Sequence, residues 1–167
     1  MHRRWLLCLG LLLVLAGCTA GPFGEQDGSV PVTVNNSANV THTFEVWVVE
    51  YPGNVTIRRS TGYDYTEDIS PGLSTREPGD YHTVTAVEFP DSARLRGEYT
   101  LEPDEMNRSD IDGLPGDFAV YVVVYQDDHV VSRVSAHCGG DLAFLRVTMF
   151  HYGSGSAYNC EGGLLQF

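Results

Sequence analysis

A pair of apolar segments joined by a short acidic turn, within residues 118–136, constrains the fold of this chain more than any other feature. Residues 118–125 are all apolar or aromatic, and residues 130–136 are again rich in valine. β-Branched and aromatic side chains favour strands, and the short link at 126–129 suits a turn between antiparallel neighbours. We therefore predict a β-hairpin here.

Extended patterns also occupy most of the chain before this hairpin. Val30, Val32 and Val34 alternate with Pro31 and Thr33, which predicts a strand. The segment 42–51 has apolar side chains on both faces, so both faces are expected to be covered. Further strands are predicted at 55–59, 81–89, 94–101 and 142–150. In the third of these, Leu95 is expected to face inward while Arg94 and Arg96 face outward.

Three stretches carry no clear strand pattern. Residues 60–80 contain two Pro-Gly pairs and are predicted to be the longest irregular segment. Residues 103–112 are expected to hold one helical turn, and residues 153–156 a flexible loop. In total the sequence indicates about eight short strands and no long amphipathic helix. This pattern predicts an all-β antiparallel sandwich of about 7–9 strands over residues 30–167.

Residues 1–17 are typical of an export signal. Two arginines provide a short basic start, and the apolar run at 5–17 is too short for a membrane span but suits a signal peptide. No other apolar run approaches the length of a bilayer span. Residues 18–29 are rich in glycine and are expected to tether residue 18 to the folded domain.

The sequence Leu15-Ala16-Gly17-Cys18 resembles the lipobox of bacterial and archaeal lipoproteins. In those proteins cleavage occurs before the cysteine, whose thiol carries lipid, so the resemblance implies that Cys18 is a lipid anchor. Arg3-Arg4-Trp5-Leu6-Leu7 resembles a twin-arginine export signal, with an ordinary Sec leader as the alternative. We therefore expect a protein anchored in the cell membrane through Cys18 and facing outside.

Two cysteines, Cys138 and Cys160, remain beyond the leader and the anchor. In an oxidising compartment they are expected to form a disulfide, which contributes about 3 kcal/mol. The alternative is a copper site that uses His137, Cys138 and His151, because copper accepts thiolate and imidazole ligands. We favour the disulfide and expect no cofactor.

Charge limits the partners of such a protein. The chain has no lysine, and its 22 acidic residues exceed its 10 arginines, which gives a formal net charge of −12. Nucleic-acid binding is therefore not expected, because it requires a basic face. The composition resembles that of proteins from extreme halophiles, in which Asp and Glu keep the surface hydrated at high salt.

A second resemblance concerns the fold. Residues 32–36, Val-Thr-Val-Asn-Asn, are followed at 41–46 by Thr-His-Thr-Phe-Glu-Val. This pattern resembles the N-terminal hairpin of small immunoglobulin-like domains in haloarchaeal lipoproteins, over residues 30–51 and 97–103. The resemblance implies an immunoglobulin-like β-sandwich.

Four Asn-x-Ser/Thr sequences are candidates for N-glycosylation: Asn35, Asn39, Asn54 and Asn107. Asn35 and Asn39 are expected to share one turn and Asn54 to lie in the next. Both turns are therefore expected at the surface.

The acidic segment 104–113 does not fit the EF-hand pattern, because Arg108 would occupy the first ligand position. A less regular Ca²⁺ site made by Asp110, Asp112 and Asp117 remains an alternative to a hydrated acidic surface.

Catalytic patterns are also lacking. Residues 153–156, Gly-Ser-Gly-Ser, do not match a nucleophile elbow, and the histidines are scattered along the chain. His42 and His82 lie near predicted strand starts, where a partly buried, hydrogen-bonded imidazole is expected. The chain is therefore not expected to be an enzyme.

Two hypotheses for function remain. The first is a lipid-anchored extracytoplasmic module with a binding or structural role at the cell surface. It would work through the loops at 60–80 and 104–117, and its partner would be a protein or glycan. The second is a surface lipoprotein that handles copper or calcium.

Overall fold

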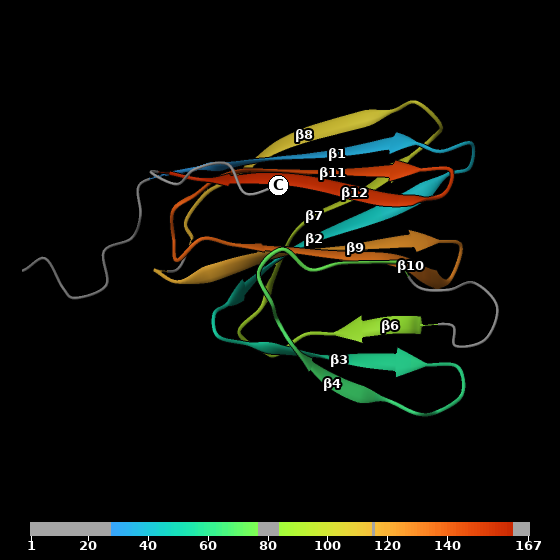
Figure 1. Ribbon diagram of the computed structural model, residues 1–167, viewed down its shortest axis with the longest axis horizontal. Coiled ribbons are helices and arrows are strands. Elements are labelled where there is room, and N and C mark those ends of the chain that lie inside the picture. Colours follow the sequence, from blue (N-terminus) through green and yellow to red (C-terminus); the bar gives the residue numbers. More distant parts are fainter. Residues whose placement is uncertain (1–27, 77–83, 115, 162–167) are drawn as a thin grey trace, which may run out of the picture.

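The computed structural model describes residues 28–76, 84–114 and 116–161, which form strands and turns without any α-helix. The strands belong to two sheets that are arranged in three layers (Figure 1). The predicted all-β sandwich is confirmed, with more strands than the sequence indicated: the described residues contain 12. The proposed leader and tether lie almost entirely outside the described residues.

The smaller sheet forms one outer layer. Its strand order is β12 (Gly153–Cys160), β11 (Leu142–Phe150), β1 (Val30–Ser37) and β8 (Met106–Ile111). β1 is parallel to β11 and antiparallel to β8. Alternate residues of β1 are buried, so this sheet places one face on the core and the other toward solvent.

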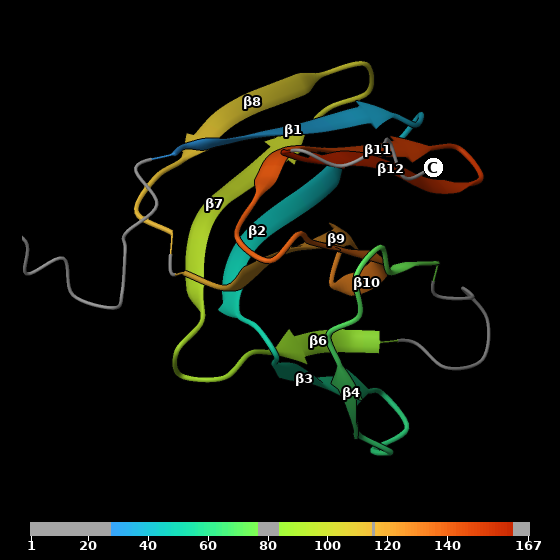
Figure 2. The same cartoon turned by 60° about the vertical axis from the view of Figure 1, so that its left-hand side comes forward.

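The larger sheet supplies the other two layers. Its main path is β4 (Tyr65–Asp68), β3 (Asn54–Arg59), β6 (Val84–Glu88), β10 (His129–His137), β9 (Phe118–Gln126), β2 (His42–Glu50) and β7 (Arg94–Leu101), and β5 (Ser74–Arg76) pairs with β10. Among residues 84–114 and 116–161, Val130 opposite Val84 is the residue pair that joins β10 to β6. Beyond it, β6, β3 and β4 form a third layer on the far side of β9 and β10 (Figures 1 and 2).

Strand β9 is buried on both faces and therefore serves two cores. One set of its side chains packs in the core shared with the smaller sheet: Phe118, Val120, Val122 and Val124. The alternate set packs against the third layer: Ala119, Tyr121 and Val123. The period of two in a strand produces this division, because consecutive side chains point to opposite faces.

The predicted hairpin at 118–136 is confirmed. β9 and β10 pair from Gln126 opposite His129, so the turn consists of Asp127 and Asp128. Asp127 has a φ of 53°, a conformation that aspartate adopts more readily than most side chains.

The three segments that were expected to be irregular or helical contain strands. Residues 60–80 include β4 and β5. β8 stands where a helical turn was expected at 103–112, and residues 153–156, expected to be a flexible loop, are the first residues of β12. Each pairs with a more regular strand: β4 with β3, β5 with β10, β8 with β1 and β12 with β11. The sequence prediction was wrong here because the neighbouring strand, and not local alternation, stabilises these segments.

The predicted orientation of β7 was wrong at Leu95, whereas Arg94 and Arg96 are exposed. A register shift between Val46 and Trp47 places Leu95 opposite Trp47 and Arg94 opposite Val48. Such a shift exchanges the faces of the sheet. Leu95 is consequently 45% exposed, and Arg94 shares a face with the core residue Val48.

Candidate binding site

Three turns surround a cavity of about 180 Å³ at one end of the sandwich. The turns are β1–β2, β9–β10 and β11–β12, together with adjoining strand residues. The lining combines apolar, amide and imidazole side chains from these segments: Ala38, Asn39, Val40, His42, Gln126, Val131, Met149, Phe150 and His151. Such a mixed concave surface is typical of a binding site.

Strand pairing explains why these turns meet. β1 and β11 run in parallel and end together, with Ser37 opposite Phe150. β2 and β9 are antiparallel neighbours, with Thr43 opposite Tyr125. The ends of β1, β9 and β11 and the start of β2 therefore gather at one end of the molecule (Figure 1).

The buried side chain of Asn36 holds the β1–β2 turn in place. Its Nδ2 donates hydrogen bonds to the carbonyls of Val40 at 2.8 Å and Leu101 at 2.9 Å. Its Oδ1 accepts a hydrogen bond from the backbone N–H of Ala38 at 3.2 Å. One amide thus satisfies buried backbone groups from two segments, which fixes the shape of the cavity wall.

His42 lies beside this amide. Its Nδ1 is 3.1 Å from the Oδ1 of Asn36, and because that oxygen can only accept, Nδ1 carries the proton. Burial lowers the pKa of His42 below its ordinary value of 6.5, and a backbone hydrogen bond to Val40 acts more weakly in the opposite direction. The expectation of a buried, hydrogen-bonded imidazole is confirmed for His42, whereas His82 lies outside the described residues.

The rim of the cavity is apolar and exposed. Val40 is 39% exposed, Phe150 51% and Tyr152 79%. His151 connects two of the turns, because its Nδ1 lies 3.0 Å from the Oδ1 of Asn39 and its ring packs edge-on against Tyr152 with centroids 4.5 Å apart. Three large apolar side chains are therefore exposed at this end of the molecule.

The four glycosylation candidates occupy different environments. Asn39 is exposed at the cavity rim, and Asn54 is exposed at the start of β3. Asn35 was expected in the turn, but it lies within β1. Asn107 lies in β8 opposite the core residue Val34, on the inward face of the sheet. Asn39 and Asn54 are therefore the most accessible of the four.

The expected disulfide is present between Cys138 and Cys160. It joins the end of β10 to the end of β12, far from the cavity. The alternative copper ligands are not brought together, since Cys138 is oxidised and His137 lies at the opposite end of β10 from the turn near His151. His137 instead contacts Asp117 at 2.7 Å and stacks on the ring of Tyr51.

The alternative calcium ligands are also separated. Asp110 lies in β8, Asp112 follows that strand, and Asp117 contacts His137. Within residues 28–76, 84–114 and 116–161, no three His, Cys, Asp or Glu side chains lie close enough together to hold a metal ion.

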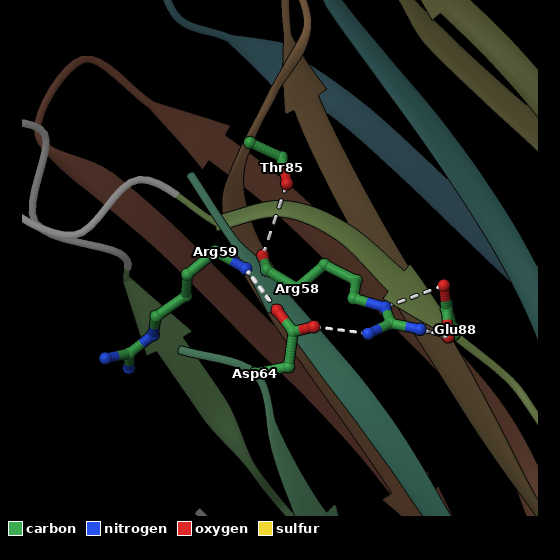
Figure 3. A network of polar contacts seen from close by, with 5 residues as sticks. All are labelled: Arg58, Arg59, Asp64, Thr85 and Glu88. Atoms are coloured by element: carbon green, nitrogen blue, oxygen red, sulfur yellow. Dashed lines mark hydrogen bonds and ion pairs between the residues drawn. The ribbon is translucent and has the colours of Figure 1, made fainter. Parts of the chain in front are cut away.

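The loops that were expected to carry binding do not line the cavity. Residues 60–68 belong to the third layer, where the Arg58 guanidinium is neutralised by Asp64 and Glu88 (Figure 3), and β5 pairs with β10. The Asp64 carboxylate also accepts the backbone N–H of Arg59, and these contacts lower its pKa. Residues 104–117 contribute to a different groove, described below.

The sequence did not show that these three turns meet around a cavity. The turn at Asn35–Asn39 was recognised as a surface segment, but nothing local to residues 149–153 relates them to it. The only signal was the position of each turn at a predicted strand end.

No helix long and apolar enough to cross a bilayer occurs in the part of the chain that the structure describes.

Two face-to-face sheets with a shared core of alternating side chains define an immunoglobulin-like β-sandwich. The family described as "Halobacterial Ig domain protein" matches residues 1–167, and the chain therefore belongs to that family. None of the curated proteins matches it.

Solved structures show only distant similarity. The chain is similar to the human-specific toxin intermedilysin at 8% identity and a TM-score of 0.36, over 80% of this chain and 24% of the toxin. A structure described as a trapped toxin gives 7% identity and a TM-score of 0.36, over 79% and 23% of the two chains. A disulfide-locked intermedilysin with human CD59 gives 8% and 0.34, over 79% and 24%. The chain spans about a quarter of the length of these proteins.

Proposed function

We propose that this chain is exported, cleaved before Cys18 and lipidated on that residue, and that it acts outside the cell as a non-enzymatic binding module. The export-type leader and the lipobox-like residues before Cys18 support the anchor. The disulfide between Cys138 and Cys160 suits an oxidising compartment. The cavity described above is the proposed site for a protein or glycan partner.

One observation carries this proposal: the cavity and the start of the folded domain lie at opposite ends of the sandwich. β1 begins at Val30, beside Ile111, and ends at Ser37, beside Phe150 at the cavity. A strand of this length covers about 26 Å, since each residue advances about 3.3 Å. A domain tethered through residues 18–29 therefore presents the cavity away from the membrane.

The chemistry of the rim supports binding rather than catalysis. Phe150 and Tyr152 offer apolar surface, and Asn39, Gln126 and His151 offer hydrogen-bonding groups around it. Protein interfaces are enriched in aromatic side chains and surrounded by polar ones.

The anchor is tested by the intact mass of protein extracted with detergent from native membranes. We expect loss of residues 1–17 and addition of lipid at Cys18, and a Cys18→Ser variant should leave the membrane fraction. A full-length, unmodified chain in the cytosol contradicts the proposal.

The site is tested by capture of surface proteins and glycans at high salt on immobilised protein. The double variant Phe150→Ser with Tyr152→Ser should retain about tenfold less of the partner captured by the parent, because exposed aromatic anchors dominate interface energy. Tyr63→Ser is the matched control, since Tyr63 is 81% exposed on the β3–β4 turn, away from the cavity. Equal retention by the double variant and the parent contradicts the proposed site.

A further inference from the structure

A second groove lies at the end of the sandwich where the chain enters the fold. It has a volume of about 290 Å³, and its walls include Arg94, Arg96 and Glu50 beside the apolar Val48 and Leu114. These residues come from the end of β2, the start of β7 and the segment after β8. Val30, the first residue of β1, pairs with Ile111 of β8. Leu114 follows Ile111 by three residues, so the groove lies near the start of β1.

Backbone carbonyls position both guanidinium groups. Arg94 Nη1 donates to the carbonyl of Asp91 at 2.8 Å and to that of Ala93 at 2.9 Å. Arg96 Nη2 donates to the carbonyl of Gly113 at 3.3 Å. A guanidinium has five N–H donors, so each group retains donors that these carbonyls do not use.

These arginines differ from Arg58 and Arg133 in how their charge is balanced. Arg58 binds Glu88 through two contacts and also binds Asp64 (Figure 3), and Arg133 binds Glu67 at 3.1 Å. Within the described residues, neither arginine of the groove forms an ion pair with a carboxylate. In a chain with 22 acidic residues, two adjacent unpaired guanidinium groups indicate a site for an external anion.

The position of the groove identifies the source of that anion, on the basis of the proposed anchor. Val30 lies twelve positions after Cys18 in the sequence, and a fully extended segment of that length reaches about 40 Å. Because the groove lies at the same end of the sandwich as Val30, an anchored domain directs it toward the membrane surface, where lipid phosphates are concentrated.

We propose that the groove binds the phosphate of a membrane phospholipid whose headgroup carries a hydroxyl, such as phosphoglycerol. Arg94 and Arg96 donate hydrogen bonds to the phosphate oxygens. Glu50 accepts a hydrogen bond from the headgroup hydroxyl, which accounts for a carboxylate beside two arginines. The contact holds the domain upright on the bilayer, with the cavity of the opposite end facing outward.

The test uses residues 18–167 with Cys18→Ser, which retain every described residue but carry no lipid. Flotation with phosphatidylglycerol vesicles is compared with flotation using phosphatidylcholine vesicles. Salt at about 1 M limits the Debye length to about 3 Å, so that only close contacts contribute. We expect binding to the first vesicles to exceed binding to the second by about tenfold.

Paired variants separate a site from general charge. Arg94→Gln with Arg96→Gln should reduce binding to phosphatidylglycerol vesicles by about tenfold. The control is Arg108→Gln with Arg146→Gln, which makes the same change in charge on two exposed residues that flank Thr33 on the outer face of the smaller sheet. Equal losses in the two double variants would overturn the proposal, as would equal binding to both kinds of vesicle.

A competition experiment with glycerol phosphate distinguishes a lipid from a soluble phosphate. Glycerol phosphate alone should compete only weakly, because it lacks the membrane that presents many headgroups at once. Tight binding of glycerol phosphate without vesicle binding overturns the lipid assignment. The Cys18→Ser variant carries no lipid, so its vesicle binding does not depend on the proposed lipidation. Failure of the variant to bind vesicles is therefore distinguishable from failure of the lipidation, which the intact mass reports.

Discussion

The two cores on either side of β9 share that strand and yet differ in buried charge. The core between the sheets is formed by apolar side chains such as Phe44, Val122 and Leu145. The core beneath the third layer also contains the buried Arg133, which lies opposite Val123 and binds Glu67 of β4. The first core fixes the sandwich and the turns around the cavity, whereas the second attaches an additional layer through paired polar groups.

The attachment of the third layer explains this difference. Within the described residues, which begin at Val84 in this strand, one residue pair joins β6 to β10. Side-chain contacts must supply the remaining cohesion, including the stacking of Phe89 on Trp47 at 4.4 Å. The layer is therefore expected to open more readily than the sandwich.

The largest expected effect follows from truncation in the apolar core. Phe44→Ala should lower the free energy of unfolding by about 3–5 kcal/mol, because the side chain is fully buried. Ile57→Ala, in the other core, should instead reduce hydrogen-exchange protection in β3, β4 and β6 while protection in β1 and β11 persists. Denaturant unfolding and hydrogen exchange measure the two changes. Parallel loss of protection in all strands would show that the two cores unfold as one unit.

The next effect concerns the buried ion pair. Arg133→Met should destabilise the chain by about 3 kcal/mol, because it leaves the partly buried Glu67 without its partner. The double variant Arg133→Met with Glu67→Leu should recover most of that loss. A double-mutant cycle with urea unfolding measures the coupling, and additive effects would show that the pair contributes little to the second core.

A smaller, pH-dependent effect is expected at the end of the apolar core. Because burial lowers the pKa of folded His42, the unfolded state binds the proton more readily. The stability due to neutral His42 is therefore fully present above about pH 6.5 and decreases as the pH falls through that value. His42→Gln should flatten this dependence in thermal melts between about pH 8 and pH 5. An unchanged slope would assign the dependence to the other histidines.

The smallest effect is expected at Tyr121. Its hydroxyl is buried without a well-aligned hydrogen-bond partner among the described residues, and burial raises the pKa of Tyr121 to about 12. Tyr121→Phe removes a polar group whose desolvation is poorly compensated, so the change in stability should be within about 1 kcal/mol. Val123→Ser, which introduces a buried hydroxyl into the same core, is the matched comparison and should be clearly destabilising.

Parts of the fold and site were predictable for local reasons. The β9–β10 hairpin, the doubly covered β2 and the pairing of Cys138 with Cys160 follow from features that are continuous in the sequence or limited to two candidates. β8 and β12 were not predicted, because their short polar segments become strands only beside β1 and β11. The exposure of Leu95 was missed because a bulge depends on both strands of a pair.

Period-two alternation, turn residues and cysteine count determined by themselves that this chain forms an all-β domain with one disulfide in the described part, since these signals act over a few neighbouring residues. Only the tertiary structure decided which turns surround a cavity, that Asn36 and His42 support it, and that Arg94 and Arg96 share a groove at the other end. Those relationships depend on strand order and register between segments as far apart as residues 37 and 150. Sheet pairing creates them, and a linear sequence does not display it.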